Sequence, residues 1–388
     1  RVLALLGLVW VAWGVVSAFK GDSVEATLRK INRVYPVAMF ESYARQQVAS
    51  HQIFAVPRVA APSAPARADL IVLVIGESAS AQRWSLLGYG GHDTNAALRP
   101  LQADLQALPV LANGNNTALA LPVLLSGQGL EHLPPQGLPT YLDWARAAGF
   151  RVATFSNQST SGTAETFFHA AYRQRSDWYV NLPDGEYDGA LTPLLQQALG
   201  EARESGQPLL VTLHTYGSHP RTGKRYPPER AHWDDVYDNS IAYASELLAQ
   251  WIGLLQTEGQ GRRAVLLYLS DHGLNLLDCG GNYTHGSARS AYEVPLLAWS
   301  NAAFRAAQPA WAAQLAHHAQ PAPEGLPRLD NRVFAATVAD LLGYGGATAY
   351  PSLGAPQDAP EPLLGGQPYR ARAQANACDV RAQGGPLH

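Results

Sequence analysis

From residue 69 onward, short apolar runs alternate with longer stretches in which apolar positions recur at helical spacing. A continuous apolar run of this length is typical of a strand that is buried on both faces of a parallel sheet. Such runs predict strands at 70–76, 150–156, 208–214, 264–270 and 293–299. The helical periodicity predicts helices at 140–148, 191–204, 239–256 and 331–343. This alternation indicates an α/β fold with a mostly parallel central sheet and helices on both of its faces.

The apolar run 264–270 ends abruptly in Asp271 and His272, and Gly273 then lets the chain turn. Open parallel sheets hold their ligands just beyond the carboxyl ends of the strands. A carboxylate and an imidazole at that place are typical metal ligands. The alternative interpretation is an Asp that begins a helix, followed by a surface His.

A second run, 70–76, ends in the same way, with Glu77 and Ser78. Taken alone, Glu77 could be a carboxylate at a helix start, which the helix dipole favours. Buried carboxylates are costly without a cation or another partner. The two strand endings together therefore predict a metal site.

The N-terminal region carries no charge from Val2 to Phe19, a length close to the ~20 apolar residues that cross a bilayer. A signal peptide, a buried core helix and the last helix of a membrane region are the three interpretations. The sequence AFKGDS, 18–23, is a poor signal-cleavage site. We expect the end of a transmembrane region at 1–20, interfacial helices and an extended linker at 21–68, and a catalytic domain at 69–388.

Composition bears on two classes of site, a nucleic-acid interface and a cysteine zinc cluster. A net charge of -3 over 388 residues gives no support for a nucleic-acid partner. The only two cysteines, Cys279 and Cys378, are too few for a cysteine zinc cluster. In an oxidising compartment they would form a disulfide, and otherwise they are two free thiols.

Candidate groups for chemistry also lie outside the two strand endings. Thr117 follows a polar turn and is expected at a helix N-terminus, where backbone N–H groups favour an anion. A hydroxyl there becomes a nucleophile if a metal lowers its pKa, although an ordinary capping Thr is the simpler alternative. His214 and His219 follow the strand 208–214, and His285 comes shortly after Asp271. The carboxyl edge of one sheet would gather these histidines in space.

Seven motifs in a fixed order carry a family resemblance, over roughly residues 70–345. The chain resembles the phosphoethanolamine transferases of the alkaline phosphatase and sulfatase superfamily. The motifs are IGES with Arg83 and LLGYG, then Thr117 before Pro122, SNQ at 156–158, LHTYGSHP with KRYP, YDNSIAYAS, SDHG and THG.

The resemblance implies an alkaline phosphatase-like fold and a zinc site, with manganese as the alternative metal. It implies that Thr117 is transiently phosphoethanolaminated. His219 and His285 match histidines that contact the phosphoryl group or a second zinc ion, and Asn157 lies near the matched substrate region. The implied zinc ligands are Glu77, Thr117, Asp271 and His272.

The implied reaction moves phosphoethanolamine from phosphatidylethanolamine to a cell-envelope glycan or lipid A. The enzyme would sit in the bacterial inner membrane with its catalytic domain in the periplasm. A phosphoglycerol transferase or metal-dependent phosphodiesterase of the same superfamily is one alternative, and an inactive lipid- or glycan-binding module is another.

The chain also departs from the family pattern at two places. It reads SDHGLNLLD where lipid A-modifying members read SDHGESLGE, so the acceptor stays open. The sequence TALALP, 117–122, lacks the Cys or Ser setting from which sulfatases make formylglycine.

Overall fold

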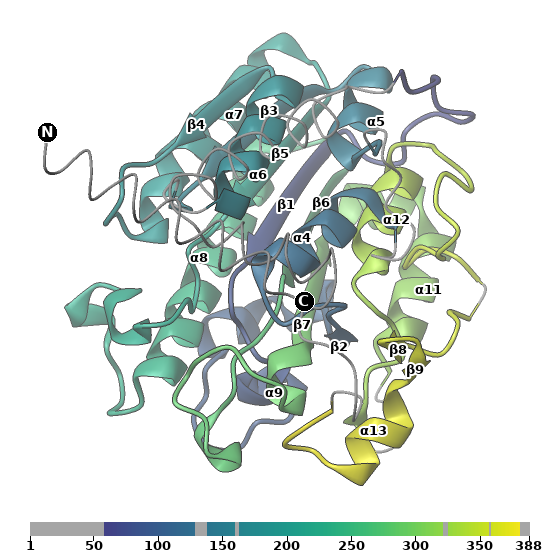
Figure 1. The fold of residues 1–388 in the computed structure, drawn as a ribbon. Helices are drawn as coiled ribbons and strands as arrows, with labels where there is room; N and C mark the ends of the chain where they lie inside the picture. Colours follow the sequence, from purple (N-terminus) through teal and green to yellow (C-terminus); the bar gives the residue numbers. More distant parts are fainter. Residues whose placement is uncertain (1–57, 129–137, 160–162, 321–324, 357, 381–388) are drawn as a thin grey trace, which may run out of the picture. The chain divides into compact units, whose positions relative to one another are not determined.

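The computed structural model describes residues 58–128, 138–159, 163–320, 325–356 and 358–380. Its centre is a seven-stranded sheet with the strand order β2-β7-β6-β1-β5-β3-β4 (Figure 1). The strands are β1 (Leu70–Gly76), β2 (Leu105–Leu111), β3 (Arg151–Ser156), β4 (Trp178–Asn181), β5 (Leu209–His214), β6 (Ala264–Ser270) and β7 (Glu293–Ser300). All five predicted strands are present.

The sheet is mostly parallel, as predicted. β6, β1, β5, β3 and β4 pair in parallel, whereas β7 runs antiparallel to both of its neighbours, β6 and β2. Because β7 is reversed, its first residue, Glu293, lies at the same edge as the last residues of β1 and β6. That edge therefore collects Glu77, Asp271 and the start of β7.

Helices cover both faces of the sheet because successive side chains of a strand point to opposite sides. On β1, Leu70, Val72 and Val74 pack into one hydrophobic cluster, together with α7 (Thr192–Ser205) and α8 (Val236–Glu258).

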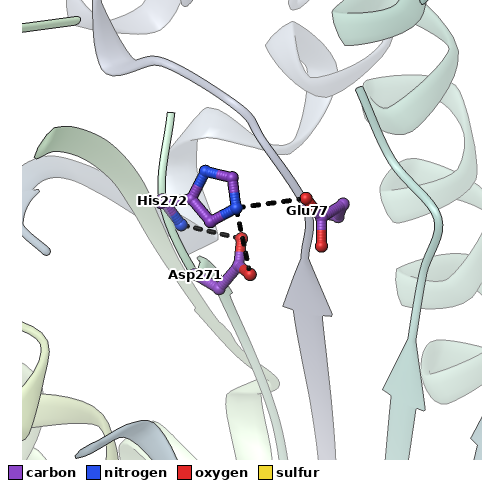
Figure 2. Close-up of side chains that lie close together, drawn as sticks. All are labelled: Glu77, Asp271 and His272. Atoms are coloured by element: carbon purple, nitrogen blue, oxygen red, sulfur yellow. Dashed lines mark hydrogen bonds and ion pairs between the residues drawn. The ribbon is translucent and has the colours of Figure 1, made fainter. Parts of the chain in front are cut away.

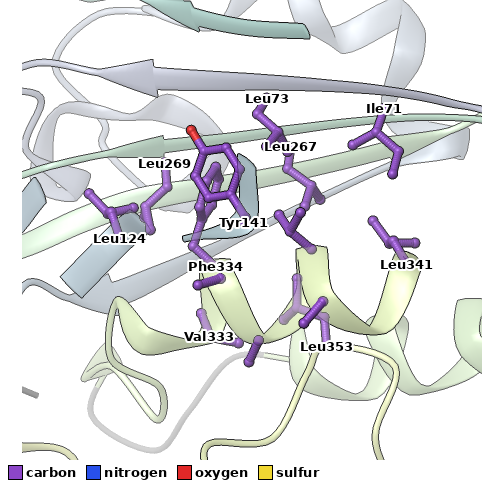
Figure 3. Close-up of a cluster of buried hydrophobic side chains, with 14 of the residues drawn as sticks. Ile71, Leu73, Leu124, Tyr141, Leu267, Leu269, Val333, Phe334, Leu341 and Leu353 are labelled. Carbon is purple, nitrogen blue, oxygen red and sulfur yellow. The ribbon is translucent and has the colours of Figure 1, made fainter. Parts of the chain in front are cut away.

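The alternate β1 residues Ile71 and Leu73 pack into the second cluster, which Figure 3 shows. That cluster includes side chains of α4 (Thr117–Ser126), α5 (Tyr141–Ala147) and α12 (Arg332–Leu341). The helices predicted at 140–148, 191–204, 239–256 and 331–343 are thereby confirmed as α5, α7, α8 and α12. Removing one large core side chain, as in Leu267→Ala, would cost about 2–5 kcal/mol.

Shorter elements complete the described structure. They are α6 (Thr163–Arg175), α9 (Arg289–Tyr292), α10 (Ala302–Ala307), α11 (Pro309–His318), β8 (Leu363–Leu364), β9 (Gln367–Pro368) and α13 (Tyr369–Ala375).

A disulfide joins Cys279 to Cys378, with 5.2 Å between the two Cα atoms. Two backbone hydrogen bonds flank it, from Arg289 N to the Ala377 carbonyl and from Val380 N to the Ser287 carbonyl, each 2.9 Å long. The C-terminal segment is thus fastened to the loop between β6 and β7. The disulfide interpretation of the two cysteines is confirmed.

The expected transmembrane segment at 1–20 and the interfacial helices within 21–56 lie outside the described residues. Within the ranges that the structure does describe, no helix is both long enough and apolar enough to cross a bilayer. Residues 58–69, the second part of the predicted linker, form no helix or strand before β1 begins. They pack beside α12, where Arg67 N bonds the Leu341 carbonyl at 2.8 Å and the Arg67 side chain pairs with Asp340.

Candidate metal centre and nucleophile

Three side chains converge at the carboxyl edge of the sheet. Glu77 directly follows β1, and Asp271 and His272 directly follow its neighbour β6. His272 Nε2 lies 3.3 Å from Glu77 Oε1 and 3.6 Å from Asp271 Oδ2 (Figure 2). All three side chains are buried. Their ligand atoms lie within 4.8 Å of one another, as one bound cation would require.

The orientation of His272 leaves one ring nitrogen for a metal. Its Nδ1 lies 2.8 Å from the Gly273 carbonyl, which can only accept a hydrogen bond. Nδ1 therefore carries the hydrogen, and Nε2 faces the two carboxylates. Metal-binding histidines are commonly held in this way, by a backbone carbonyl on the other ring nitrogen.

Thr117 joins the triad from another element. It is the first residue of α4, and the side chain of Asn116 caps the helix by accepting from Leu119 N. The Thr117 hydroxyl donates a 3.0 Å hydrogen bond to Glu77 Oε2 and lies 3.5 Å from His272 Nε2. The predicted helix N-terminus at Thr117 is confirmed, and its side chain is half-buried.

The pKa values of the three side chains depend on their burial and on one another's charge. Burial raises the pKa of Asp271 to about 7, and the charge of Glu77 adds to this rise. Burial opposes ionisation of Glu77 too, but the charge and hydrogen bond of His272, with smaller effects of His219 and Ser78, together hold the pKa of Glu77 below its usual range. Burial also disfavours the charged form of His272, yet Asp271 and Glu77 together raise its pKa to about 9. Two buried carboxylates next to one imidazole favour a bound cation.

The backbone around Glu77 is fixed by several contacts. Ser78 has a positive φ of 58°, and its hydroxyl donates a 2.6 Å hydrogen bond to Glu77 Oε1. The Tyr237 hydroxyl donates to the Ser78 carbonyl at 2.7 Å. Gly217 has no space for a side chain, since a Cβ there would lie 2.5 Å from the Glu77 carbonyl oxygen. The segment Glu77–Ser78 is therefore enclosed by α8 and by the loop after β5, and the Ser78 hydroxyl orients the carboxylate.

Gln158, rather than its neighbour Asn157, contacts the triad. Both residues follow directly after the end of β3. Gln158 Nε2 donates to Glu77 Oε2 at 3.2 Å and to the Thr215 carbonyl at 2.7 Å. Asn157 Nδ2 instead donates to Asp188 and to the Glu186 carbonyl. Gln158 and Ser78 were not among the predicted site residues, although both stand next to a predicted strand end.

Two further histidines lie beside the triad. The His285 ring centre is 4.9 Å from that of His272 and 6.5 Å from that of His219. Burial lowers the pKa of both His219 and His285. His285 is exposed and His219 half-buried, so both stand on the open side of the centre. His214, which ends β5, is fully buried, and its Nδ1 lies 3.4 Å from the Tyr172 hydroxyl.

The donor set fits zinc. Zinc prefers four ligands drawn from carboxylate, imidazole and similar groups, and the centre offers two carboxylates, one imidazole and one hydroxyl. Asp271 Oδ2 is buried and has no hydrogen-bond partner among the described residues, so a cation would satisfy it.

Comparison with known proteins agrees with this architecture. The family model described as Sulfatase matches residues 69–344, which include β1, α4, β6 and all the side chains of the centre. The chain belongs to the sulfatase family.

Two curated relatives come from Escherichia coli strain K12. YhbX is 32% identical over 249 residues, which cover 60% of this chain and 43% of YhbX. Phosphoethanolamine transferase EptA is 29% identical over 266 residues, which cover 60% of this chain and 46% of EptA. The chain thus spans less than half the length of these relatives.

A solved structure shares the fold. The periplasmic domain of EptC from Escherichia coli, in complex with zinc, matches with a TM-score of 0.63 at 22% identity. The match covers 78% of this chain and 91% of that domain. The predicted alkaline phosphatase-like α/β fold is confirmed at this level.

Proposed function

We propose that this chain transfers phosphoethanolamine from phosphatidylethanolamine to a glycan or lipid A of the cell envelope, through a covalent intermediate on Thr117. The observation that carries the proposal is the 3.0 Å contact between the Thr117 hydroxyl and Glu77, at a centre completed by Asp271 and His272. A hydroxyl at a helix N-terminus, beside a site built for a cation, is suited to attack a phosphodiester. The likeness to EptA supports ethanolamine as the transferred group.

In the first step, Thr117 Oγ1 attacks the phosphorus of the donor in line with the leaving oxygen. The bond between phosphorus and the diacylglycerol oxygen breaks, and that oxygen takes up one proton. The Thr117 proton leaves along its hydrogen bond toward Glu77. Diacylglycerol is released, and the phosphoethanolamine remains on Thr117.

In the second step, an acceptor hydroxyl or phosphate attacks the same phosphorus, and Thr117 regains its proton. His219 and His285 stand on the open side of the centre, where the phosphoryl oxygens and the leaving group would lie. Their role is to bind these oxygens and to exchange protons with them. Asn157 would affect substrate binding only indirectly, because its amide donates to Asp188 rather than to the substrate.

The metal that fits this centre is zinc, with Glu77, Asp271, His272 and Thr117 as its ligands. When bound, it would lower the pKa of the Thr117 hydroxyl and offset negative charge on the phosphoryl group. Manganese is the alternative metal.

A lipid donor also gives the N-terminal region a role. We propose that residues 1–20 end a transmembrane region, that 21–68 lead from the membrane surface, and that 69–388 act in the periplasm. The disulfide between Cys279 and Cys378 agrees with an oxidising compartment.

A panel of donors tests this function. The 388-residue chain, loaded with zinc, is incubated with labelled phosphatidylethanolamine or phosphatidylglycerol and with an envelope extract as acceptor. Release of diacylglycerol from phosphatidylethanolamine alone, lost in Thr117→Ala and retained in part in Thr117→Ser, is the expected result. Preference for phosphatidylglycerol would identify a phosphoglycerol transferase, and no turnover with bound zinc would favour a binding module.

A further inference from the structure

The Arg225 side chain contacts both the backbone and the ring of His219. Its Nε donates to the His219 carbonyl at 3.2 Å, and its Nη2 donates to the Pro220 carbonyl at 2.9 Å. The same Nη2 lies 3.4 Å from His219 Nδ1. The guanidinium carbon stands 3.9 Å from the centre of the Tyr216 ring, so stacking holds the Arg225 fork in place. Both the backbone and the ring of His219 are therefore oriented by one side chain.

This contact decides which nitrogen of His219 carries the hydrogen. A guanidinium has only donors and keeps its proton in proteins, so Nδ1 must accept. A neutral imidazole that accepts at Nδ1 donates at Nε2. In the other tautomer, an Nδ1–H turned toward the Pro220 carbonyl would face the Nη2–H of Arg225. The Pro220 carbonyl has two lone pairs, so it can accept from Arg225 at 2.9 Å and also attract an N–H of the His219 ring. Of these two contacts to the His219 ring, from Arg225 and from Pro220, the one from Arg225 to Nδ1 has the geometry of a hydrogen bond.

The burial of His219 and the charge of Arg225 also favour the neutral form of the ring. Burial lowers the pKa of His219, and the positive charge of Arg225 lowers it further, while the charge of Glu77 and the Pro220 carbonyl act in the opposite direction. Nε2 is the ring nitrogen that Arg225 does not contact. The neighbouring ring is His285, whose centre is 6.5 Å away, with His272 beyond it.

We propose that Arg225 is a positioning residue that fixes His219 as an Nε2–H donor to a phosphoryl oxygen, so that His219 is not a ligand of a second metal ion. The inference rests on the proposed function and deepens it. A neutral histidine binds a metal through its unprotonated nitrogen. Binding through Nε2 would move the hydrogen to Nδ1, against the guanidinium. The centre of Glu77, Asp271, His272 and Thr117 would then take one zinc ion and a phosphoryl group.

Nuclear magnetic resonance of the ring nitrogens tests the assignment directly. The full chain is labelled with ¹⁵N-histidine and measured with and without zinc, and His219→Gln identifies the signals of His219. We expect an unprotonated Nδ1 and a protonated Nε2 in both states. A protonated Nδ1, or a zinc-dependent change that removes the hydrogen from Nε2, would overturn the inference.

Two matched substitutions test the part of Arg225. Arg225→Lys loses the fork and the stacking on Tyr216, so we expect a mixture of His219 tautomers. We also expect a kcat lowered roughly 10- to 100-fold, the size of effect seen when a reacting group is misplaced. Arg230→Lys is the control, because Arg230 is exposed and pairs with Glu246. It should leave the tautomer and the kcat unchanged. An Arg225→Lys protein with the wild-type tautomer would contradict the positioning role.

Metal content gives an independent readout. Mass spectrometry of the zinc-saturated chain should find one zinc ion per chain, and the same number in His219→Gln. Two ions in the wild type and one in His219→Gln would overturn the inference. These measurements need neither donor nor acceptor, so they can fail while transfer persists. A missing transfer activity beside the expected tautomer would instead contradict the proposed function.

Discussion

The Asn115 amide nitrogen donates a 2.8 Å hydrogen bond to the carbonyl oxygen of Gly286. This contact joins two loops that are 171 positions apart in the sequence, one leading into Thr117 and the other carrying His285. Within the β6–β7 loop, Asn275 accepts from Ala288 N at 2.9 Å and pairs with Thr284 through the backbone. The loop that leads into Thr117 and the loop that carries His285 are therefore joined through the side chains of Asn115 and Asn275.

Substitution of Asn115 should affect activity more than stability. Asn115→Ala removes the hydrogen bond to Gly286 and a 3.2 Å hydrogen bond that Asn115 accepts from Asn116. Each such bond contributes about 1 kcal/mol to the unfolding free energy. A shift of about 1 Å between reacting groups can lower a rate about 100-fold, so we expect a loss of transfer between about 10- and 100-fold. Steady-state kinetics and urea unfolding measure the two effects.

Asn301→Ala is the matched control for Asn115→Ala. At the opposite edge of the sheet, Asn301 Nδ2 donates to the Arg262 carbonyl at 2.7 Å, and Asn301 Oδ1 accepts from Ala264 N and Phe304 N. The control should lose stability and keep its kcat. Equal kcat values for Asn115→Ala and the wild type would contradict a role for the loop contact.

The disulfide should stabilise the fold. Cys279 and Cys378 are 99 positions apart, and a disulfide typically stabilises a protein by about 2–4 kcal/mol. The double variant Cys279→Ser with Cys378→Ser should lower the unfolding free energy by this amount, and a reducing agent should do the same to the wild type only. Unchanged urea midpoints in both tests would show that the crosslink adds nothing to stability.

Metal binding should raise thermal stability, because two buried carboxylates lose their mutual repulsion when a cation is bound. Removing the metal from the wild type with a chelator should lower its Tm, and added zinc should restore it. A ligand present at about 1,000 times its Kd stabilises a protein by about 4 kcal/mol.

Asp271→Asn is the informative variant for this prediction. It removes one charged ligand and keeps the shape of the side chain, so it should abolish most of the rise in Tm on adding zinc. His232→Gln is the control, because His232 pairs with Glu246 on the exposed surface. A full zinc-dependent rise in Asp271→Asn would mean that the metal binds elsewhere.

Buried His214 predicts a loss of stability in acid. Burial lowers its pKa to about 3, while an unfolded histidine titrates near 6.5. Between these two pH values only the unfolded state binds the proton, so the unfolding free energy falls as pH falls. The slope from this one group approaches about 1.4 kcal/mol per pH unit below pH 6.

Unfolding in urea at pH 7.5, 6 and 5, with the metal removed, measures this slope. His214→Gln should make the dependence shallower by the stated amount, because it removes the titrating ring. His317→Gln, on the surface end of α11, should keep the wild-type slope. The same slope in His214→Gln and the wild type would contradict the prediction.

Much of the fold could be predicted because its central strands are apolar without interruption. β1, β5 and β6 are buried along their whole length, and their sequences read accordingly. β2 was missed because Pro109 interrupts it and it lies at one edge of the sheet, where a strand tolerates proline. β4, at the other edge, has four half-buried residues, too few for a periodic pattern.

Some residues of the site could likewise be predicted from the sequence, and others could not. Glu77, Asp271 and His272 could be predicted because each directly follows a buried strand and the sheet topology brings the strand ends together. Gln158 and Arg225 could not, since their partners, Glu77 and His219, are set by how loops fold over the sheet edge. No spacing in the sequence encodes a loop crossing of this kind.

The central claim is that Thr117 carries the transferred group. Its most direct test is mass spectrometry of the zinc-loaded chain after incubation with phosphatidylethanolamine in the absence of any acceptor. A phosphoethanolamine adduct on Thr117, missing in Thr117→Ala and removed when acceptor is added, is the predicted result. Transfer activity with no adduct on Thr117 at any time point, or with an adduct on another residue, would contradict the account.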